Sequence, residues 1–115
     1  MNYLGLDYGE SHVGVAIATG PLAQPLTTLD TKKALLSIKQ LVEMQSINAV
    51  VIGNSSPEFL FGLKSMGVPV HQVDETLSSV DAVEMLKHTT QSKRKSLEHS
   101  AAAAVILQSF LDSHT

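Results

Sequence analysis

The sequence predicts a single α/β domain in which helices flank a mixed five-stranded sheet. Two apolar segments of strand length, at 3–8 and 13–19, open the chain and are joined by Gly-Glu-Ser, which is typical of a β-hairpin. Farther along, short apolar runs alternate with segments of helical periodicity, as in parallel β-α-β units. A chain of 115 residues fits one compact core, so we take residues 1–115 as one domain.

A third strand and a helix are expected directly after the hairpin. The segment 24–29 has strand length, and the polar pair Asp30 and Thr31 follows it. Either residue of the pair can serve as an N-cap, because apolar residues such as Leu35 and Ile38 then recur at helical spacing. We therefore expect the first helix to begin at this pair.

The second half of the chain supplies two more strands. The run 48–53 is continuously apolar between polar residues, which is typical of a buried parallel strand. The segment 68–75 gives the last strand and ends on two acids, Asp74 and Glu75. Between these strands, a short helix is expected to begin near Ser56 and Pro57.

Two more helices are predicted at the end of the chain. A pattern similar to a capping box at 78–81 begins the first of them. A polar loop is expected over 89–96, and the last helix over 97–112. This helix contains four consecutive alanines, and Gly5 and Gly14 are small residues within the hairpin strands. Small residues on both sides predict that something packs closely against the sheet.

Composition narrows the functional classes. The chain has no cysteine, which excludes disulfides and thiolate metal sites. No apolar run approaches the roughly 20 residues of a membrane helix, and no signal-peptide pattern opens the sequence, so a cytoplasmic domain without membrane association is expected. The net charge of −3 argues against a protein that coats nucleic acid by bulk electrostatics. The dense basic cluster Lys93-Arg94-Lys95 would have to act locally.

Acidic and imidazole side chains fall at points that an α/β sheet brings together. Asp7 ends the first strand, Glu75 ends the last, and Glu98 and His99 lie near the start of the final helix. Strand ends and adjacent helix starts commonly meet at one edge of such a sheet. Carboxylates gathered there repel one another unless a cation lies between them, and Mg²⁺ prefers oxygen ligands. The pattern therefore predicts a metal site that could hydrolyse phosphodiesters.

Each residue also has a simpler interpretation. Asp7 taken alone fits a turn residue that bonds its own backbone. Glu75 fits a charge that complements a helix N-terminus, and Glu98 fits an ordinary acid of a first helical turn. It is the order of these residues along the chain that favours a shared site.

Four segments in the same order resemble the YqgF/RuvX family of the ribonuclease H-like superfamily. They are "NYLGLDYGESHVGVAIA", "AVVIG", "VPVHQVDETLSS" and "HSAAAAVILQSFLD", and together they extend over nearly the whole chain. The family comprises pre-16S rRNA nucleases and Holliday junction resolvases. The resemblance implies a ribonuclease H-like fold and a nuclease activity that depends on Mg²⁺ or Mn²⁺.

The resemblance also implies the metal ligands. The family's first-strand aspartate falls on Asp7 and its glutamate on Glu75, whereas its third acid, an aspartate, falls on His99 in this chain. Glu98 precedes His99 by one position, and helical neighbours point about 100° apart, so both cannot readily face one ion. An imidazole can ligate a divalent metal and shifts preference from Mg²⁺ towards Mn²⁺ or softer ions. The alternative is that His99 is a capping or buried residue with no metal role.

Two arginines of the family pattern are replaced here, by His12 and Thr76. Arginine is the better phosphate ligand, so a catalytically weakened or inactive nucleic-acid-binding module is the alternative to an enzyme. The other candidate nucleic-acid contacts are Gly9, Asn54, Ser78, Lys93, Arg94 and Lys95.

The substrate expected from the resemblance is structured RNA, first pre-16S rRNA, with branched DNA as the second choice. A sugar-kinase or ATPase relationship would also fit the glycines beside Asp7, but the chain is too short for the paired domains of that class. The apolar residues 59–61 are either core or the contact of a homodimer.

Overall fold

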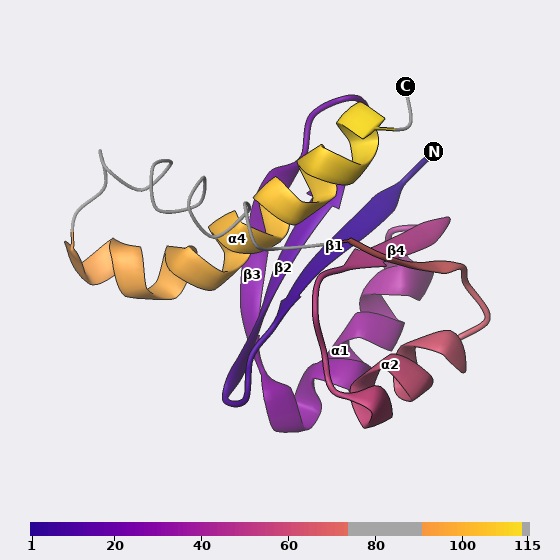
Figure 1. Ribbon diagram of the computed structural model, residues 1–115, viewed down its shortest axis with the longest axis horizontal. Coiled ribbons are helices and arrows are strands. Elements are labelled where there is room, and N and C mark those ends of the chain that lie inside the picture. Colours follow the sequence, from indigo (N-terminus) through magenta and orange to yellow (C-terminus); the bar gives the residue numbers. More distant parts are fainter. Residues whose placement is uncertain (74–90, 114–115) are drawn as a thin grey trace.

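The protein forms a five-stranded mixed sheet with helices on both faces (Figure 1). The structure is a computed structural model that describes residues 1–73 and 91–113, with only the backbone described over 91–98. The strand order is β3-β2-β1-β4-β5. Strands β3, β2 and β1 are antiparallel neighbours, whereas β4 and β5 run parallel to β1. The predicted sheet is therefore confirmed.

The bounds of the elements follow the predicted order. The strands are β1 (Tyr3–Tyr8), β2 (His12–Ala18), β3 (Gln24–Asp30), β4 (Ala49–Ile52) and β5 (Val70–Gln72). The helices are α1 (Thr31–Met44), α2 (Pro57–Lys64) and α4 (Gln91–Ser113). The helix predicted after Ser78 lies outside the described residues.

Two helices begin where their capping residues predict. The Asp30 side chain accepts a hydrogen bond from the Lys32 backbone N–H at 3.1 Å, which caps α1. The Ser56 hydroxyl accepts one from the Phe59 N–H at 3.2 Å and caps α2, with Pro57 at the first helical position. Both predicted starts are confirmed.

The predicted start of the last helix is wrong. Helix α4 begins at Gln91, so most of the segment expected as a polar loop is helical. Polarity alone predicts a loop, but Gln91 and the basic residues 93–95 are good helix formers, and neither glycine nor proline interrupts the segment. The first part of α4 consequently extends past the sheet (Figure 1).

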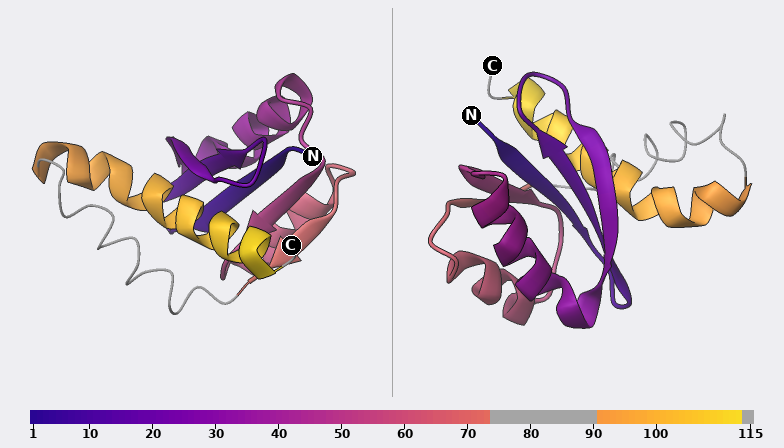
Figure 2. Two further views of the ribbon diagram at one scale, coloured as in Figure 1. Left: turned by 90° about the horizontal axis from the view of Figure 1, so that it is seen from above. Right: turned by 180° about the vertical axis from the view of Figure 1, so that it is seen from behind.

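Two apolar layers lie on opposite faces of the sheet. Figure 2 shows the helices on these two faces. Alternate residues of a strand point to opposite faces. Leu4 and Leu6 of β1 pack in the layer that includes Ile38 of α1 and Leu63 of α2. The residues that alternate with them, Gly5 and Asp7, therefore lie on the face that α4 covers. This alternation decides which β1 side chains can meet α4.

Helix α4 lies directly on the small residues of β1 and β2. A Cβ built at Gly5 would lie 2.6 Å from Cβ of Leu107 and 2.8 Å from the carbonyl oxygen of Ala103. The alanines at 101, 103 and 104 are buried. The close approach that the sequence predicts is therefore made by α4.

Leu107→Ala is expected to lower the free energy of unfolding by about 2–5 kcal/mol, because the side chain is fully buried between α4 and the sheet. Leu36→Ala is the matched control, since Leu36 is 65% exposed on α1. Urea unfolding measures both variants. Equal losses would contradict the packing described for α4.

The apolar segment 59–61 divides between core and surface. Phe59 is 5% exposed and packs in the α1–α2 layer, whereas Phe61 is 76% exposed. The homodimer that this segment suggested stays a prediction. Within the described part of the chain, no helix has the length and apolar character to cross a bilayer.

Candidate metal and nucleic-acid site

Asp7 lies near the end of β1, on the face that α4 covers. Its side chain is 19% exposed, and its partner in the neighbouring strand is Gly14 of β2. Gly14 lies against the α4 backbone: a Cβ there would overlap the carbonyl group of His99 and lie 2.7 Å from the Ser100 nitrogen. The absence of a side chain at Gly14 thus lets α4 cross β2 at the position that pairs with Asp7.

This crossing brings His99 to Asp7. The Nδ1 atom of His99 lies 3.8 Å from Oδ2 of Asp7, and the histidine side chain is 38% exposed. The separation is too long for a hydrogen bond but allows an ion pair when the imidazole is protonated. Two ligand atoms that each lie about 2.1 Å from one ion are about 3–4 Å apart, so the pair also fits a shared divalent cation.

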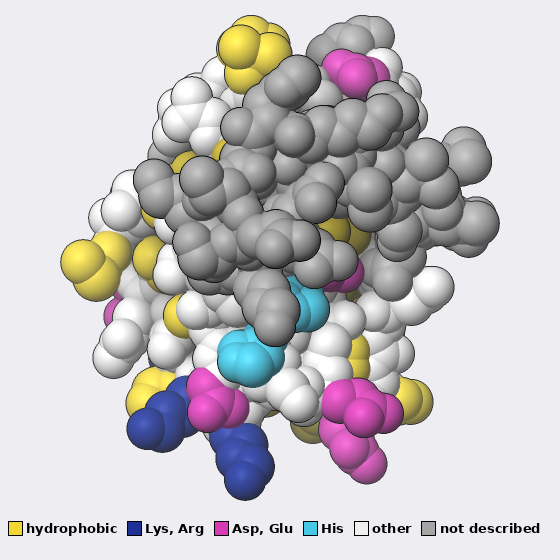
Figure 3. All heavy atoms as spheres, turned by 90° about the vertical axis from the view of Figure 1, so that its left-hand side faces the viewer, with side chains coloured by type: hydrophobic (Ala, Val, Ile, Leu, Met, Phe, Trp, Pro, Cys, Tyr) yellow, Lys and Arg dark blue, Asp and Glu magenta, His cyan; other side chains and the backbone are white. Residues whose placement is uncertain are grey.

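A second imidazole lies beside the first. The rings of His12 and His99 are stacked, with centroids 5.8 Å apart and planes at 27°. Figure 3 shows histidine side chains exposed on this face, with acidic side chains and lysines below them. The exposed charged residues of the nearby turn and the start of α1 are Glu10, Asp30, Lys32 and Lys33.

The turn between β1 and β2 is fixed by α1. The Thr31 hydroxyl donates a hydrogen bond to the Gly9 carbonyl at 2.8 Å, and the Thr31 N–H donates to the Ser11 carbonyl at 3.1 Å. These bonds hold the turn that lies beside Asp7. The sequence marked Thr31 as a capping residue, but no local pattern reveals a partner 22 positions away.

The predicted site residues are only partly brought together. Asp7, Gly9, His12 and His99 converge at the end of β1. Asn54 is exposed in the loop after β4, and β4 ends beside β1, where Ile52 pairs with Leu6.

Other predicted residues fall where side chains are not described. Glu75, Thr76 and Ser78 lie outside the described residues. The first turns of α4, which precede His99, contain Lys93, Arg94, Lys95 and Glu98. Within the described side chains, no group of three histidine, aspartate or glutamate residues is placed to hold a metal.

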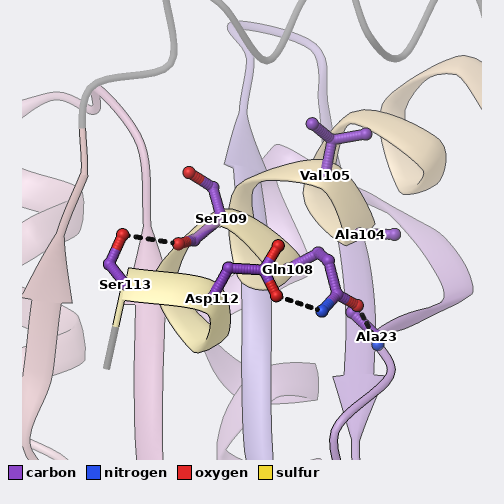
Figure 4. A pocket seen from close by; sticks show the side chains of 7 residues that line it. All are labelled: Ala23, Ala104, Val105, Gln108, Ser109, Asp112 and Ser113. Carbon is purple, nitrogen blue, oxygen red and sulfur yellow. Dashed lines mark hydrogen bonds between the residues drawn. The ribbon is translucent and has the colours of Figure 1, made fainter. Parts of the chain in front are cut away.

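A cavity of about 500 Å³ lies elsewhere on α4, along its last turns (Figure 4). The Gln108 side chain accepts a hydrogen bond from the Ala23 N–H at 2.8 Å and donates to Asp112 at 3.0 Å. The bond with Ala23 ties α4 to the connection between β2 and β3. The cavity contains one acid and no histidine, so it is not the predicted metal site.

Comparison with protein families identifies the relatives of this chain. The model of the RuvX family, described as Holliday junction resolvase, matches residues 1–59 and 55–113. The chain belongs to the RuvX family.

Curated RuvX relatives align with nearly the whole chain. A protein of Thermoanaerobacter pseudethanolicus is 32% identical over 135 residues, covering 98% of this chain and 97% of the relative. One of Syntrophus aciditrophicus is 35% identical over 135 residues, covering 97% and 89%. Both are named "Putative pre-16S rRNA nuclease". The alignments are longer than the 115-residue chain, so this RuvX member lacks residues that its relatives have.

Solved structures show the same fold at lower identity. The Thermus thermophilus RuvC in complex with a Holliday junction substrate has a TM-score of 0.65 at 17% identity, covering 99% of this chain and 95% of RuvC. The fowlpox virus resolvase in complex with Holliday junction DNA has a TM-score of 0.69 at 14% identity, covering 99% of each chain. The ribonuclease H-like fold implied by the sequence is confirmed.

Proposed function

We propose that this RuvX protein is a metal-dependent nuclease that hydrolyses phosphodiester bonds in structured RNA, with the precursor of 16S rRNA as its substrate. The observation that carries the proposal is the approach of Asp7 and His99 to 3.8 Å at the end of β1. The names of the curated relatives support the same activity and substrate. A precursor-rRNA substrate would place the activity in the cytoplasm.

The donor atoms present fit a divalent cation. Asp7 offers carboxylate oxygens and His99 an imidazole nitrogen, and we propose Glu75 as the third ligand, with Glu98 as the alternative to His99. The mixed set favours Mn²⁺ over Mg²⁺, because imidazole suits ions softer than Mg²⁺. When bound, the ion would polarise the phosphodiester and activate a water molecule.

The remaining residues bind and orient the substrate in this proposal. Gly9 carries no side chain and leaves the approach to Asp7 open. Phosphate contacts are proposed for His12, Asn54, Ser78, Lys93, Arg94 and Lys95, which would position the backbone without reading its sequence. Helix α4 carries the three basic residues on the same rigid element as His99. In this proposal α4 would thus contribute both to metal binding and to phosphate binding.

A second candidate substrate is branched DNA. The family model is described as Holliday junction resolvase, and the two similar structures contain Holliday junctions. A module of the same fold that binds nucleic acid without cleaving it is the alternative from another class, because His12 and His99 replace an arginine and an aspartate of the family pattern.

A single set of reactions separates these candidates. Purified protein is incubated with a labelled 16S precursor RNA, an unstructured RNA and a four-way DNA junction, each with Mn²⁺, with Mg²⁺ or with EDTA. We expect Mn²⁺-dependent cleavage of the precursor RNA. Cleavage of the junction alone would support the resolvase, and binding without cleavage of any substrate would support the inactive module.

His99→Asp is expected to change the metal preference, because it replaces the nitrogen donor by an oxygen donor. The ratio of the Mn²⁺-supported to the Mg²⁺-supported cleavage rate should fall several-fold. Rates measured over a series of metal concentrations report this ratio. Ser109→Asp, an exposed change on the same helix, is the control that should leave the ratio unchanged. An unchanged ratio in His99→Asp would remove His99 from the proposed ligand set.

A further inference from the structure

Backbone contacts fix the position of His12 in the sheet. It opens β2 and pairs with Asp30, the last residue of β3. The preceding turn is tied to Thr31 by the two hydrogen bonds described above. Because β2 alternates, His12 lies on the same face as Gly14 and Ala16, which is the face that α4 covers. Its backbone position is therefore fixed by the pairing with β3 and by the turn held at Thr31.

The His99 ring, in contrast, needs support from outside its own helix. The contact at Gly14 fixes the backbone of α4 at His99, but it leaves the two side-chain torsions of the histidine undetermined. The ring is more than a third exposed. On the side of the turn, Gly9 has no side chain, and even a Cβ there would lie 3.9 Å from the ring.

The aromatic contact of the His99 ring is with His12. The two imidazoles stack at 5.8 Å and 27°, and His99 in turn lies 3.8 Å from Asp7. His99 is thus the middle side chain of a row, with the His12 ring on one side and the Asp7 carboxylate on the other. Offset stacking of this kind restricts ring orientation.

We propose that His12 is a positioning residue: it packs against the His99 imidazole and holds the ring at Asp7, so that both can bind one divalent cation. The inference rests on the proposed function, since it assumes that Asp7 and His99 bind a metal. Beside the proposed phosphate contact, it assigns His12 a second role that depends on ring packing alone and needs no nucleic acid. An aromatic ring without nitrogen should therefore replace it.

Manganese alone is the probe, without nucleic acid. We expect His12→Ala to weaken Mn²⁺ binding by about 2- to 10-fold in isothermal titration, and His12→Phe to bind within about twofold of the unchanged protein. His71→Ala is the matched control, because it removes another exposed histidine that contacts an aromatic ring, Phe110, on the β5 side. It should not change Mn²⁺ binding. Equal affinities in His12→Ala and the unchanged protein would overturn the proposal, as would failure of His12→Phe to restore binding.

The same substitution in a His99→Ala background tests the route of the effect. If His12 acts through His99, His12→Ala should cause no further loss of Mn²⁺ affinity in that background. An equal further loss would show that His12 acts directly and would overturn the proposal.

The ring signals of His99 separate this proposal from the proposed function. In metal-free protein, the nuclear Overhauser contacts between the His99 ring protons and the protons of Asp7 should be lost in His12→Ala and kept in His12→Phe. If the unchanged protein bound no Mn²⁺, the metal-site hypothesis would fail. The placement of the ring by His12 would still be supported by loss of these contacts in His12→Ala, and contacts that persist in His12→Ala would overturn it.

Discussion

Replacing Asp7 by asparagine should reduce the cleavage rate by at least about 100-fold while leaving the fold intact. The substitution keeps the shape of the side chain but removes the negative charge that the cation needs. Asp7 is the one acidic residue that the described structure places beside His99. Its position in β1 is set by backbone pairing with Gly14, which the substitution does not alter. The assay is Mn²⁺-dependent cleavage of labelled precursor RNA.

A matched acid tests whether the loss is specific to this carboxylate. Glu10 is exposed in the adjoining turn, so Glu10→Gln removes the same charge from the same neighbourhood without removing the proposed ligand. We expect Glu10→Gln to keep most of the activity. Thermal unfolding of both variants should show changes of about 1 kcal/mol or less, as is usual for substitutions outside the core. Cleavage by Asp7→Asn at the normal rate would contradict the metal mechanism.

The sequence predicts the sheet because its signals are local. The hairpin, the strand 48–53 and the helix starts at 30–31 and 56–57 each follow from a few neighbouring residues, and the structure confirms them. The polar composition of 89–96 predicts a loop, which is wrong, because helix propensity prevails there and α4 begins at Gln91. Local patterns thus succeed where one signal dominates and fail where two compete.

The site was harder to predict, because its contacts join distant parts of the chain. Asp7 and His99 were expected to meet at one sheet edge, and the structure places them together. No local sequence pattern indicates the stacking of His12 on His99 or the hydrogen bonds from Thr31 to the β1–β2 turn. Each depends on how α4 or α1 packs against the sheet. Glu75, predicted as a ligand, stays a prediction.

Gly14→Ala is expected to destabilise the protein by about 1–3 kcal/mol, because the added methyl group would occupy space that the α4 backbone fills. The overlap involves the His99 carbonyl group and the Ser100 nitrogen, and neither can move without displacing the helix. Backbone conformation does not contribute, since Gly67 is the glycine recorded with a positive φ angle among the described residues. Urea unfolding measures the loss.

Gly20→Ala is the matched control for the same change of residue. No described atom lies within 4 Å of a Cβ built at Gly20. The free energy of unfolding of Gly20→Ala should therefore stay within about 1 kcal/mol of that of the unchanged protein, or rise slightly, because alanine lowers the entropy of the unfolded chain. Similar losses in both variants would show that the effect comes from alanine itself rather than from contact with α4.

The functional effect of Gly14→Ala should exceed what its stability explains. Below its unfolding temperature the variant is folded, but α4 must shift away from β2 to admit the methyl group. That shift moves His99 away from Asp7, because the overlap lies at the His99 backbone itself. We therefore expect folded Gly14→Ala to bind Mn²⁺ more weakly than the unchanged protein at the same temperature.

The core variant Leu107→Ala, two turns farther along α4 than His99, is the control. It should lose stability without a comparable loss of Mn²⁺ affinity. Equal Mn²⁺ affinity in folded Gly14→Ala would mean that the approach of α4 to β2 does not set the geometry of the metal pair.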